Sequence, residues 1–228
     1  MKGSNLNIES KFPKKVLEII EQCGVIAVLI IDNVQNAVPV AKALMDGGIT
    51  AMELTLRTPA AIESLVSIQE QVPEMLAGIG TILTPKQVKD IVKAGAAFGV
   101  APGLNPDVVL KAQQLGLPFA PGVATPSELE KAISLGCKEI KFFPAEAMGG
   151  LKYLKSFAAP YKHLGIRYIP LGGLNAGNMA DYLQEPSVLA LGGSWIAKRE
   201  LIQQQDWQSI TTNASEARKL ADQSRKGD

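Results

Sequence analysis

The chain has 228 residues, of which 46% are hydrophobic, and this is enough for one domain, residues 1–228, around a buried core. Its 23 Lys and Arg residues nearly balance 22 Asp and Glu residues, and no basic stretch alternates with aromatic residues, which argues against a nucleic-acid partner. The N-terminus is polar and the longest apolar run, residues 25–31, is too short to cross a bilayer, so we expect no membrane partner and a cytoplasmic protein acting on a small molecule.

The scarcity of histidine narrows the chemistry that the chain can perform. His163 is the only histidine, and Cys23 and Cys137 do not lie in a metal-binding spacing. Zinc enzymes usually use two or three His ligands, and acid–base catalysis uses His most often. The sequence therefore predicts no metal and no cofactor, with chemistry carried by Lys, Glu, Asp or Tyr side chains.

Short apolar runs alternate with amphipathic stretches along the whole chain. The predicted strands cover residues 24–30, 51–56, 76–80, 98–101, 118–120, 138–143, 167–171 and 188–191. Strands separated by amphipathic stretches of this length are typical of repeated βα units. We therefore predict an α/β fold, a single (β/α)8 TIM barrel with an extra N-terminal helix, and a doubly wound open sheet is the alternative.

Several predicted strands lead into a capping residue followed by proline. These pairs are Thr58-Pro59, Thr84-Pro85, Asn105-Pro106 and Thr125-Pro126. The side-chain oxygen of the first residue can accept a hydrogen bond from the first helical turn, and the proline presets φ where the helix begins. Each pair therefore predicts the start of a helix.

The second predicted strand carries two charged residues on one face. Alternation along residues 51–57 places Glu53 and Arg57 on the side opposite the apolar residues that cover the helices. A carboxylate inside a barrel is costly unless it is paired or lies in a functional cavity. Arg57 ends the strand, where barrels place functional groups, and a guanidinium suits capture of a substrate carboxylate. A purely structural Glu–Arg pair is the alternative.

The sixth predicted strand contains a lysine among apolar residues. Lys141 shares a face with Phe143, whereas Ile140 and Phe142 face the helices. Burial disfavours the ammonium form and leaves free amine, which attacks ketones. Lys141 and Glu53 in one barrel therefore predict imine chemistry in which the carboxylate moves the proton. A lysine that reaches the surface is the alternative.

Two glycine pairs follow the last two predicted strands. They are Gly172-Gly173 and Gly192-Gly193, and Ser194 comes directly after the second pair. Glycines let backbone N–H groups approach an anion closely, and the hydroxyl adds a donor. Because barrels frequently bind phosphate on these two loops, the pairs predict a phosphate site. Tight turns without a ligand are the alternative.

Motifs spread over nearly the whole chain resemble those of one enzyme family. They are Glu53-Leu54-Thr55-Leu56-Arg57, Gly78-Ile79-Gly80-Thr81, Pro102-Gly103, Pro121-Gly122, Lys141-Phe142-Phe143-Pro144-Ala145-Glu146 and Gly192-Gly193-Ser194-Trp195. Together they resemble the 2-keto-3-deoxy-6-phosphogluconate (KDPG) aldolase family, with its bifunctional 4-hydroxy-2-oxoglutarate (KHG) members. The resemblance implies a metal-independent class I aldolase that assembles as a homotrimer.

The resemblance also implies substrates and residue roles. KDPG would be cleaved to pyruvate and glyceraldehyde 3-phosphate, and KHG to pyruvate and glyoxylate. Lys141 resembles the Schiff-base lysine, and Glu53 the proton-transfer carboxylate. Arg57 and Thr81 match positions that hold the pyruvyl carboxylate, and Phe143 matches an aromatic residue beside the keto acid. The residues that match the phosphate loops are Gly172, Gly173, Gly192, Gly193 and Ser194.

One residue departs from the family pattern. KDPG-cleaving members usually have Thr before the first glycine pair, whereas this chain has Leu171. An apolar residue there resembles the phosphogalactonate-cleaving relatives, so the preferred C4 epimer stays open. A phosphosugar isomerase or epimerase on the same barrel, and a catalytically silent phosphate-binding protein, are further alternatives.

Overall fold

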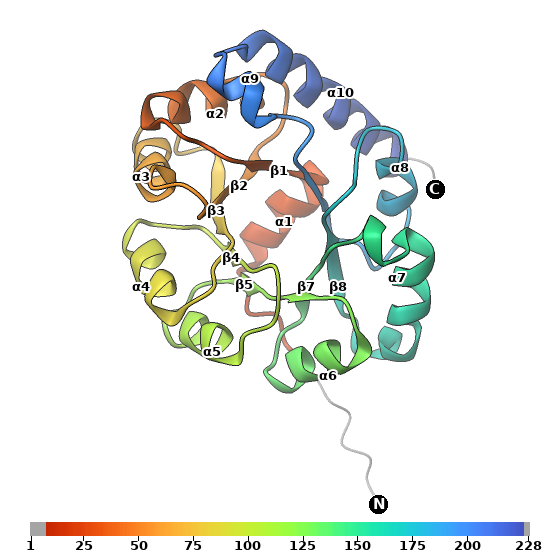
Figure 1. Cartoon of the computed structure of the whole chain (residues 1–228). Helices are drawn as coiled ribbons and strands as arrows, with labels where there is room; N and C mark the ends of the chain where they lie inside the picture. The colour runs from red at the N-terminus through yellow and green to blue at the C-terminus, as the bar shows by residue number, and fades with distance from the viewer. Residues whose placement is uncertain (1–7, 226–228) are drawn as a thin grey trace, which may run out of the picture.

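A computed structural model describes residues 8–225 of the chain, with strands at the centre and helices around them (Figure 1). The strands are β1 (Val25–Leu29), β2 (Ala51–Thr55), β3 (Leu76–Gly80), β4 (Gly99–Val100), β5 (Phe119–Ala120), β6 (Gly122–Val123), β7 (Glu139–Phe142), β8 (Arg167–Pro170) and β9 (Leu191–Gly193). The α-helices are α1 (Lys14–Cys23), α2 (Ala37–Asp46), α3 (Ala61–Gln71), α4 (Pro85–Lys93), α5 (Pro106–Gln114), α6 (Pro126–Ser134), α7 (Gly150–Ala158), α8 (Met179–Leu183), α9 (Arg199–Gln203) and α10 (Trp207–Arg225). Short 3-10 helices are η1 (Val34–Asn36), η2 (Glu146–Met148) and η3 (Ala159–Leu164).

The paired strands run parallel in two hydrogen-bonded sheets. A curled six-stranded sheet has the order β5-β4-β3-β2-β1-β9, and a second sheet has the order β6-β7-β8. Parallel neighbours need crossover connections, and the helices supply them on the outside of the strands (Figure 1). Helix α1 precedes β1 and lies behind the strands in this view, so the viewer faces the carboxyl ends of the strands. Within residues 8–225, none of the helices combines the length and the apolar character needed to cross a bilayer.

The predicted strands are found in place, and several differ at their ends. The strand predicted for residues 76–80 is β3 without change. The strand predicted for residues 118–120 is too short. Strand β5 is interrupted at Pro121, which has no N–H to donate, and strand pairing resumes as β6. The strand predicted for residues 188–191 is displaced: Val188 forms only an isolated bridge with Tyr168, and β9 begins at Leu191.

The predicted helix caps are confirmed at Thr84, Asn105 and Thr125, whose side chains accept hydrogen bonds from the first helical turn. The cap predicted at Thr58 is wrong. Its hydroxyl donates instead to the carbonyl of Ile31 at 2.5 Å, and α3 begins later without a side-chain cap. Thr58 therefore joins the loops that follow β1 and β2.

The outward face of β7 packs as strand alternation predicts. The ring of Phe142 stacks with those of Tyr153 and Phe157 on α7, with centroids 6.0 and 5.9 Å apart. Ile140 is also fully buried. Because these side chains fill the space under α7, the alternate residues of β7 are left facing the interior of the strands.

Glu139, the first residue of β7, is a buried acid at the amino end of the strands. Its exposed fraction is 3%. Burial raises the pKa of its carboxyl, and a hydrogen bond with Ser10 and the charges of Lys138 and Arg167 oppose that shift. The protonated acid is thus favoured by folding.

We predict that Glu139→Gln is more stable than the wild type at neutral pH. Because the folded-state pKa is raised, the wild type has its full stability below the unfolded pKa of about 4.3 and loses part of it as the pH rises through the folded-state value. Glutamine resembles the protonated acid, so its advantage in urea unfolding should be present at about pH 7.5 and fade toward about pH 4. Glu74→Gln, at an exposed acid, is the control and should follow the wild type. An advantage independent of pH would contradict a titrating origin.

Candidate active site

Lys141 and Glu53 face each other from β7 and β2, which belong to different sheets. The distance from Lys141 Nζ to Glu53 Oε1 is 3.5 Å, and the two side chains are 7% and 4% exposed. Charges buried this deeply are tolerated when they are paired. The ion partner of Glu53 is therefore Lys141 rather than Arg57, and Lys141 does not reach the surface.

Gly80 leaves the space that the Glu53 side chain occupies. A Cβ atom built on Gly80 would lie 1.7 Å from Glu53 Oε1 and 2.4 Å from its Cδ. Any larger residue would push the carboxylate from its place beside Lys141. No role for Gly80 is predicted from the sequence, although glycine inside a strand is a known signal of close approach by another group.

Phe143 lies beside the lysine, as predicted. Its ring centroid is 5.4 Å from Lys141 Nζ. The same ring lies 3.3 Å from the position that a Cβ atom on Gly172 would take. Gly172 therefore lets the loop after β8 approach the strand that carries the lysine.

The two glycine pairs lie next to each other, but only Gly172-Gly173 follows its strand as predicted. Gly192 and Gly193 are the last two residues of β9, so the prediction that they follow a strand is wrong, because this strand begins and ends later than predicted. The buried side chain of Leu171 connects them, because its Cγ lies 2.2 Å from the position of a Cβ atom on Gly192. Gly172 and Gly173 have φ angles of 97° and 81°, which glycine adopts at little cost. Ser194 follows the second pair and is exposed.

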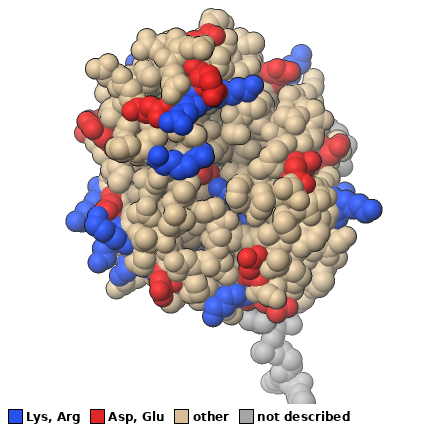
Figure 2. Space-filling view, in the orientation of Figure 1, with Lys and Arg blue, Asp and Glu red and all other residues tan. Residues whose placement is uncertain are grey.

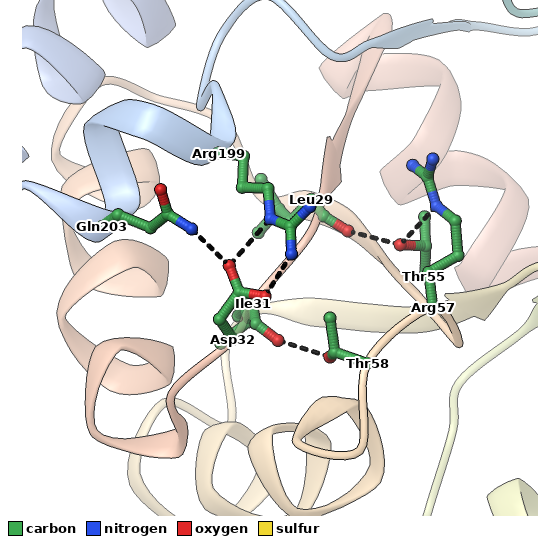
Figure 3. Close-up of polar contacts among 8 residues, drawn as sticks. All are labelled: Leu29, Ile31, Asp32, Thr55, Arg57, Thr58, Arg199 and Gln203. Atoms are coloured by element: carbon green, nitrogen blue, oxygen red, sulfur yellow. Dashed lines mark hydrogen bonds and ion pairs between the residues drawn. The ribbon is translucent and has the colours of Figure 1, made fainter.

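Arg57 lies beyond the end of β2 and is exposed. The strand alternation predicted along residues 51–57 therefore ends at Thr55. Its Nε donates to Thr55 Oγ1 at 3.3 Å, and the Thr55 hydroxyl donates to the carbonyl of Leu29 at 3.1 Å (Figure 3). The terminal nitrogens reach none of the other residues drawn (Figure 3). They are oriented through Nε and stay available for another acceptor.

Thr81 follows β3 at the same edge of the six-stranded sheet. It is half-buried and has a φ of 63°, a left-handed conformation that is rare for a β-branched residue. Such a conformation costs about 1–3 kcal/mol and is found mainly at functional sites. The sequence motif predicts Thr81 in the site, but not this backbone conformation.

A charged cluster fixes the loops beside Arg57. Asp32 follows β1 and accepts hydrogen bonds from Arg199 at 2.5 and 2.8 Å and from Gln203 at 2.9 Å, both of them on α9 (Figure 3). The hydrogen bond from Arg199 holds the pKa of the Asp32 carboxyl below its usual range. No sequence motif marks this cluster, since Asp32 and Arg199 are 167 residues apart.

The face that the carboxyl ends of the strands form is hollowed (Figure 2). The recess lies near the middle of that face, with acidic and basic atoms at its base (Figure 2). Within residues 8–225, no group of three or more His, Cys, Asp or Glu side chains is placed to hold a metal ion. A buried amine opposite a carboxylate can form an imine with a ketone and transfer a proton to or from it.

Comparison with known proteins identifies the family. The family described as KDPG and KHG aldolase matches residues 16–213. The chain belongs to this family. A KHG/KDPG aldolase of Escherichia coli K12 is 41% identical over 193 residues, which cover 85% of this chain and 90% of the relative. A 2-dehydro-3-deoxy-phosphogluconate aldolase of Treponema pallidum is 40% identical over 86% of this chain and 92% of its own.

A solved structure of the same family is also similar in fold. It is a KDPG aldolase from Legionella pneumophila, in which pyruvate was captured at low pH as a covalent carbinolamine intermediate. Its TM-score with this chain is 0.83 at 38% sequence identity, and the match covers 88% of this chain and 96% of the Legionella chain. The α/β fold with a curled parallel sheet is therefore shared with this aldolase.

Proposed function

We propose that the chain is a class I aldolase that cleaves KDPG to pyruvate and glyceraldehyde 3-phosphate through an imine on Lys141. The observation that carries the proposal is the buried Lys141 amine, 3.5 Å from the Glu53 carboxylate. Family membership supports it, because the relatives bear the name of KDPG aldolase. The covalent pyruvate in the Legionella enzyme is the kind of intermediate that a lysine amine forms with a 2-keto acid.

In the proposed cycle Lys141 holds the substrate covalently and Glu53 moves the protons. Lys141 passes a proton to Glu53, the free amine attacks C2 of the substrate, and return of that proton to the carbinolamine hydroxyl releases water and gives an iminium. Glu53, directly or through one water, takes the proton of the C4 hydroxyl while the C3–C4 bond breaks and its electrons move into the iminium. The aldehyde leaves, and Glu53 returns its proton to C3 of the resulting enamine. Hydrolysis then releases pyruvate and restores the amine, so the cycle needs no metal or cofactor.

The remaining site residues fit two ends of one substrate. Arg57, held through Nε by Thr55, suits the pyruvyl carboxylate, with Thr81 beside it. The Phe143 ring would pack on the bound keto acid next to Lys141. The phosphate would lie on the paired glycine loops of Gly172, Gly173, Gly192, Gly193 and Ser194. Cleavage of KHG, which lacks the phosphate, would use the first group of contacts without the second.

We also propose that the two sheets form one closed eight-stranded barrel within a single domain, residues 1–228, with α1 as its extra N-terminal helix. At one junction, β5 and β6 are parts of one strand, and the N–H of Lys141 donates to the Pro121 carbonyl between them at 3.0 Å. At the other, Tyr168 on β8 pairs with Val188, just before β9. A homotrimer and a cytoplasmic location stay predictions, and sedimentation would test the first.

We predict that borohydride in the presence of pyruvate adds a stable mass to Lys141. An imine is reduced to a secondary amine that survives denaturation and peptide mapping by mass spectrometry. Lys141→Met should abolish both the adduct and the turnover of KDPG. Lys138→Met, at the residue just before β7, is the control and should keep both. A folded wild type without the adduct would favour the isomerase or epimerase alternative, and an adduct with no turnover of any phosphorylated keto-deoxy acid would refute the proposed substrate class.

We predict that Gly80→Ala lowers kcat about a hundredfold without unfolding the protein. The new methyl group would displace the Glu53 carboxylate, and misplacement of a catalytic group by about 1 Å can cost that much. Gly103→Ala is the matched control, because a Cβ atom there meets nothing within 4 Å. Pyruvate release measured by a coupled assay would show the difference. Equal rates for the two variants would exclude Glu53 from the mechanism.

One residue favours a second candidate substrate, the phosphogalactonate epimer of KDPG at C4. Leu171 fills the space beside Gly192 with apolar atoms where a threonine would offer a hydroxyl. We predict that Leu171→Thr shifts the ratio of kcat/KM toward the gluconate epimer over the galactonate epimer, by about tenfold or more, since a matched hydroxyl contact is worth more than apolar volume. Steady-state kinetics with both epimers would measure it, and an unchanged ratio would remove Leu171 from the selectivity of the site.

A further inference from the structure

The segment after β8 is joined to the segment after β7 by backbone hydrogen bonds. The N–H of Ala145 donates to the carbonyl of Leu171 at 2.7 Å, and the N–H of Glu146 donates to the carbonyl of Gly172 at 3.0 Å. These bonds hold the two segments together beyond the ends of β7 and β8. The Gly172-Gly173 pair therefore begins at a fixed place beside the strand that carries Lys141.

The side chain of Glu146 fills the space beside Gly173. A Cβ atom built on Gly173 would lie 2.6 Å from Glu146 Cβ and 2.8 Å from its Cγ. The carboxylate extends toward the start of α7, where its Oε1 lies 3.1 Å from the position of a Cβ atom on Gly150. The aliphatic stem of Glu146 thus packs directly against the backbone of the glycine pair and limits its movement.

Tyr182 on α8 holds the Glu146 carboxylate in this place. Its hydroxyl donates to Glu146 Oε1 at 2.5 Å. Tyr182 is 2% exposed, whereas Glu146 is exposed. Burial and the hydrogen bond to Glu146 raise the pKa of Tyr182, so the hydroxyl is a donor at neutral pH. The core therefore fixes the tyrosine, and the tyrosine fixes a carboxylate that is otherwise free in solvent.

The segment between Gly173 and α8 is closed on itself by Asn178. Its side-chain amide donates to the carbonyl of Gly173 at 3.3 Å, and its Oδ1 accepts from the N–H of Asn175 at 2.9 Å. Within residues 8–225, the N–H groups of Gly172, Gly173 and Leu174 donate to no backbone carbonyl. Successive free N–H groups of this kind suit an anion.

We propose that Glu146 and Tyr182 are positioning residues for the substrate phosphate, which hold the Gly172-Gly173 pair in the conformation that binds it and take no part in the imine chemistry. The inference rests on the proposed function. A segment that is already ordered loses less conformational entropy when the phosphate binds, so the pair contributes to affinity. The hydrogen bond also keeps the Glu146 carboxylate near Gly150, and without it this negative charge could approach the phosphate and repel it.

Tyr182→Phe tests the inference, because it removes the hydroxyl and keeps the ring. We expect KM for KDPG to rise about tenfold with kcat nearly unchanged, as for loss of one hydrogen bond to a charged group that supports binding alone. KHG carries no phosphate, so its KM should stay at the wild-type value. Borohydride trapping of pyruvate on Lys141 should need the same pyruvate concentration as in the wild type.

Three further variants separate positioning from a general loss of structure. Glu146→Gln keeps the side-chain volume and an acceptor for Tyr182, so its KM for KDPG should stay near the wild-type value. Glu146→Ala should raise KM at least as much as Tyr182→Phe. Tyr161→Phe is the matched control, because Tyr161 of η3 also donates to a glutamate, Glu130, at 2.9 Å, and it should leave KM unchanged.

Calorimetric titration with inorganic phosphate distinguishes this inference from the proposed function. The wild type should bind phosphate about tenfold more tightly than Tyr182→Phe, and the comparison needs no turnover. Weaker phosphate binding by Tyr182→Phe in a chain that forms no borohydride adduct would refute the aldolase and support the positioning role. An adduct on Lys141 with an unchanged KM for KDPG in Tyr182→Phe would refute the positioning role and support the aldolase.

Other results would also overturn the inference. They are equal phosphate binding by the wild type and Tyr182→Phe, a lower kcat for KDPG and KHG alike in Tyr182→Phe, the same rise in KM in Tyr161→Phe, or equal impairment of Glu146→Gln and Glu146→Ala.

Discussion

The buried pair of Lys141 and Glu53 constrains much of the rest of the structure. Neither charge can be buried alone at an acceptable cost, and each is tolerated because the other lies 3.5 Å away. The pair joins β7 to β2, which belong to different hydrogen-bonded sheets. The two sheets must therefore face each other across a common interior, which is also what a closed barrel requires. Burial of this ion pair and the arrangement of the two sheets therefore require the same geometry.

Small residues make that interior possible. Two of the inward positions of β3 are glycines. The space beside Gly80 holds the Glu53 carboxylate, and the space beside Gly78 holds the ring of Phe98, which would lie 2.4 Å from a Cβ atom. Protein interiors are close-packed, so a side chain can be aimed at a partner only where its neighbours give it room. Glycine on β3 is thus as much a part of the site's geometry as the charged residues on β2 and β7.

Local patterns predict most of the fold, because alternation and capping depend on neighbours in the chain. Alternation correctly places Phe142 against α7 and leaves Lys141 facing inward. Features that depend on distant partners are not predicted. Thr58 resembles a helix cap, yet its hydroxyl is taken by the carbonyl of Ile31. The bond between Asp32 and Arg199 spans 167 residues, and no motif in either segment indicates it.

The same distinction holds within the site. Lys141 and Glu53 can be singled out from the sequence because each is a charged residue in an apolar strand, and burying a charge is costly unless it is paired. The left-handed φ of Thr81 has no such signal, because threonine is a poor residue for that conformation and a sequence-based argument would avoid it. Family motifs predict Thr81 in the site without giving a physical reason. The surrounding fold must hold it there, against its own preference.

The residues at the two ends of β8 differ in what their side chains contribute. At the carboxyl end, Leu171 packs over Gly192 between the two glycine pairs, the position from which we propose that it affects substrate choice. Residues at the amino ends of barrel strands usually contribute to stability. The Tyr168 hydroxyl at the amino end of β8 does not, because it is buried without a hydrogen-bond partner within residues 8–225. Phenylalanine would make the same ring contact with Phe157 and would not bury an unpaired polar group. Stability therefore does not account for the Tyr168 hydroxyl.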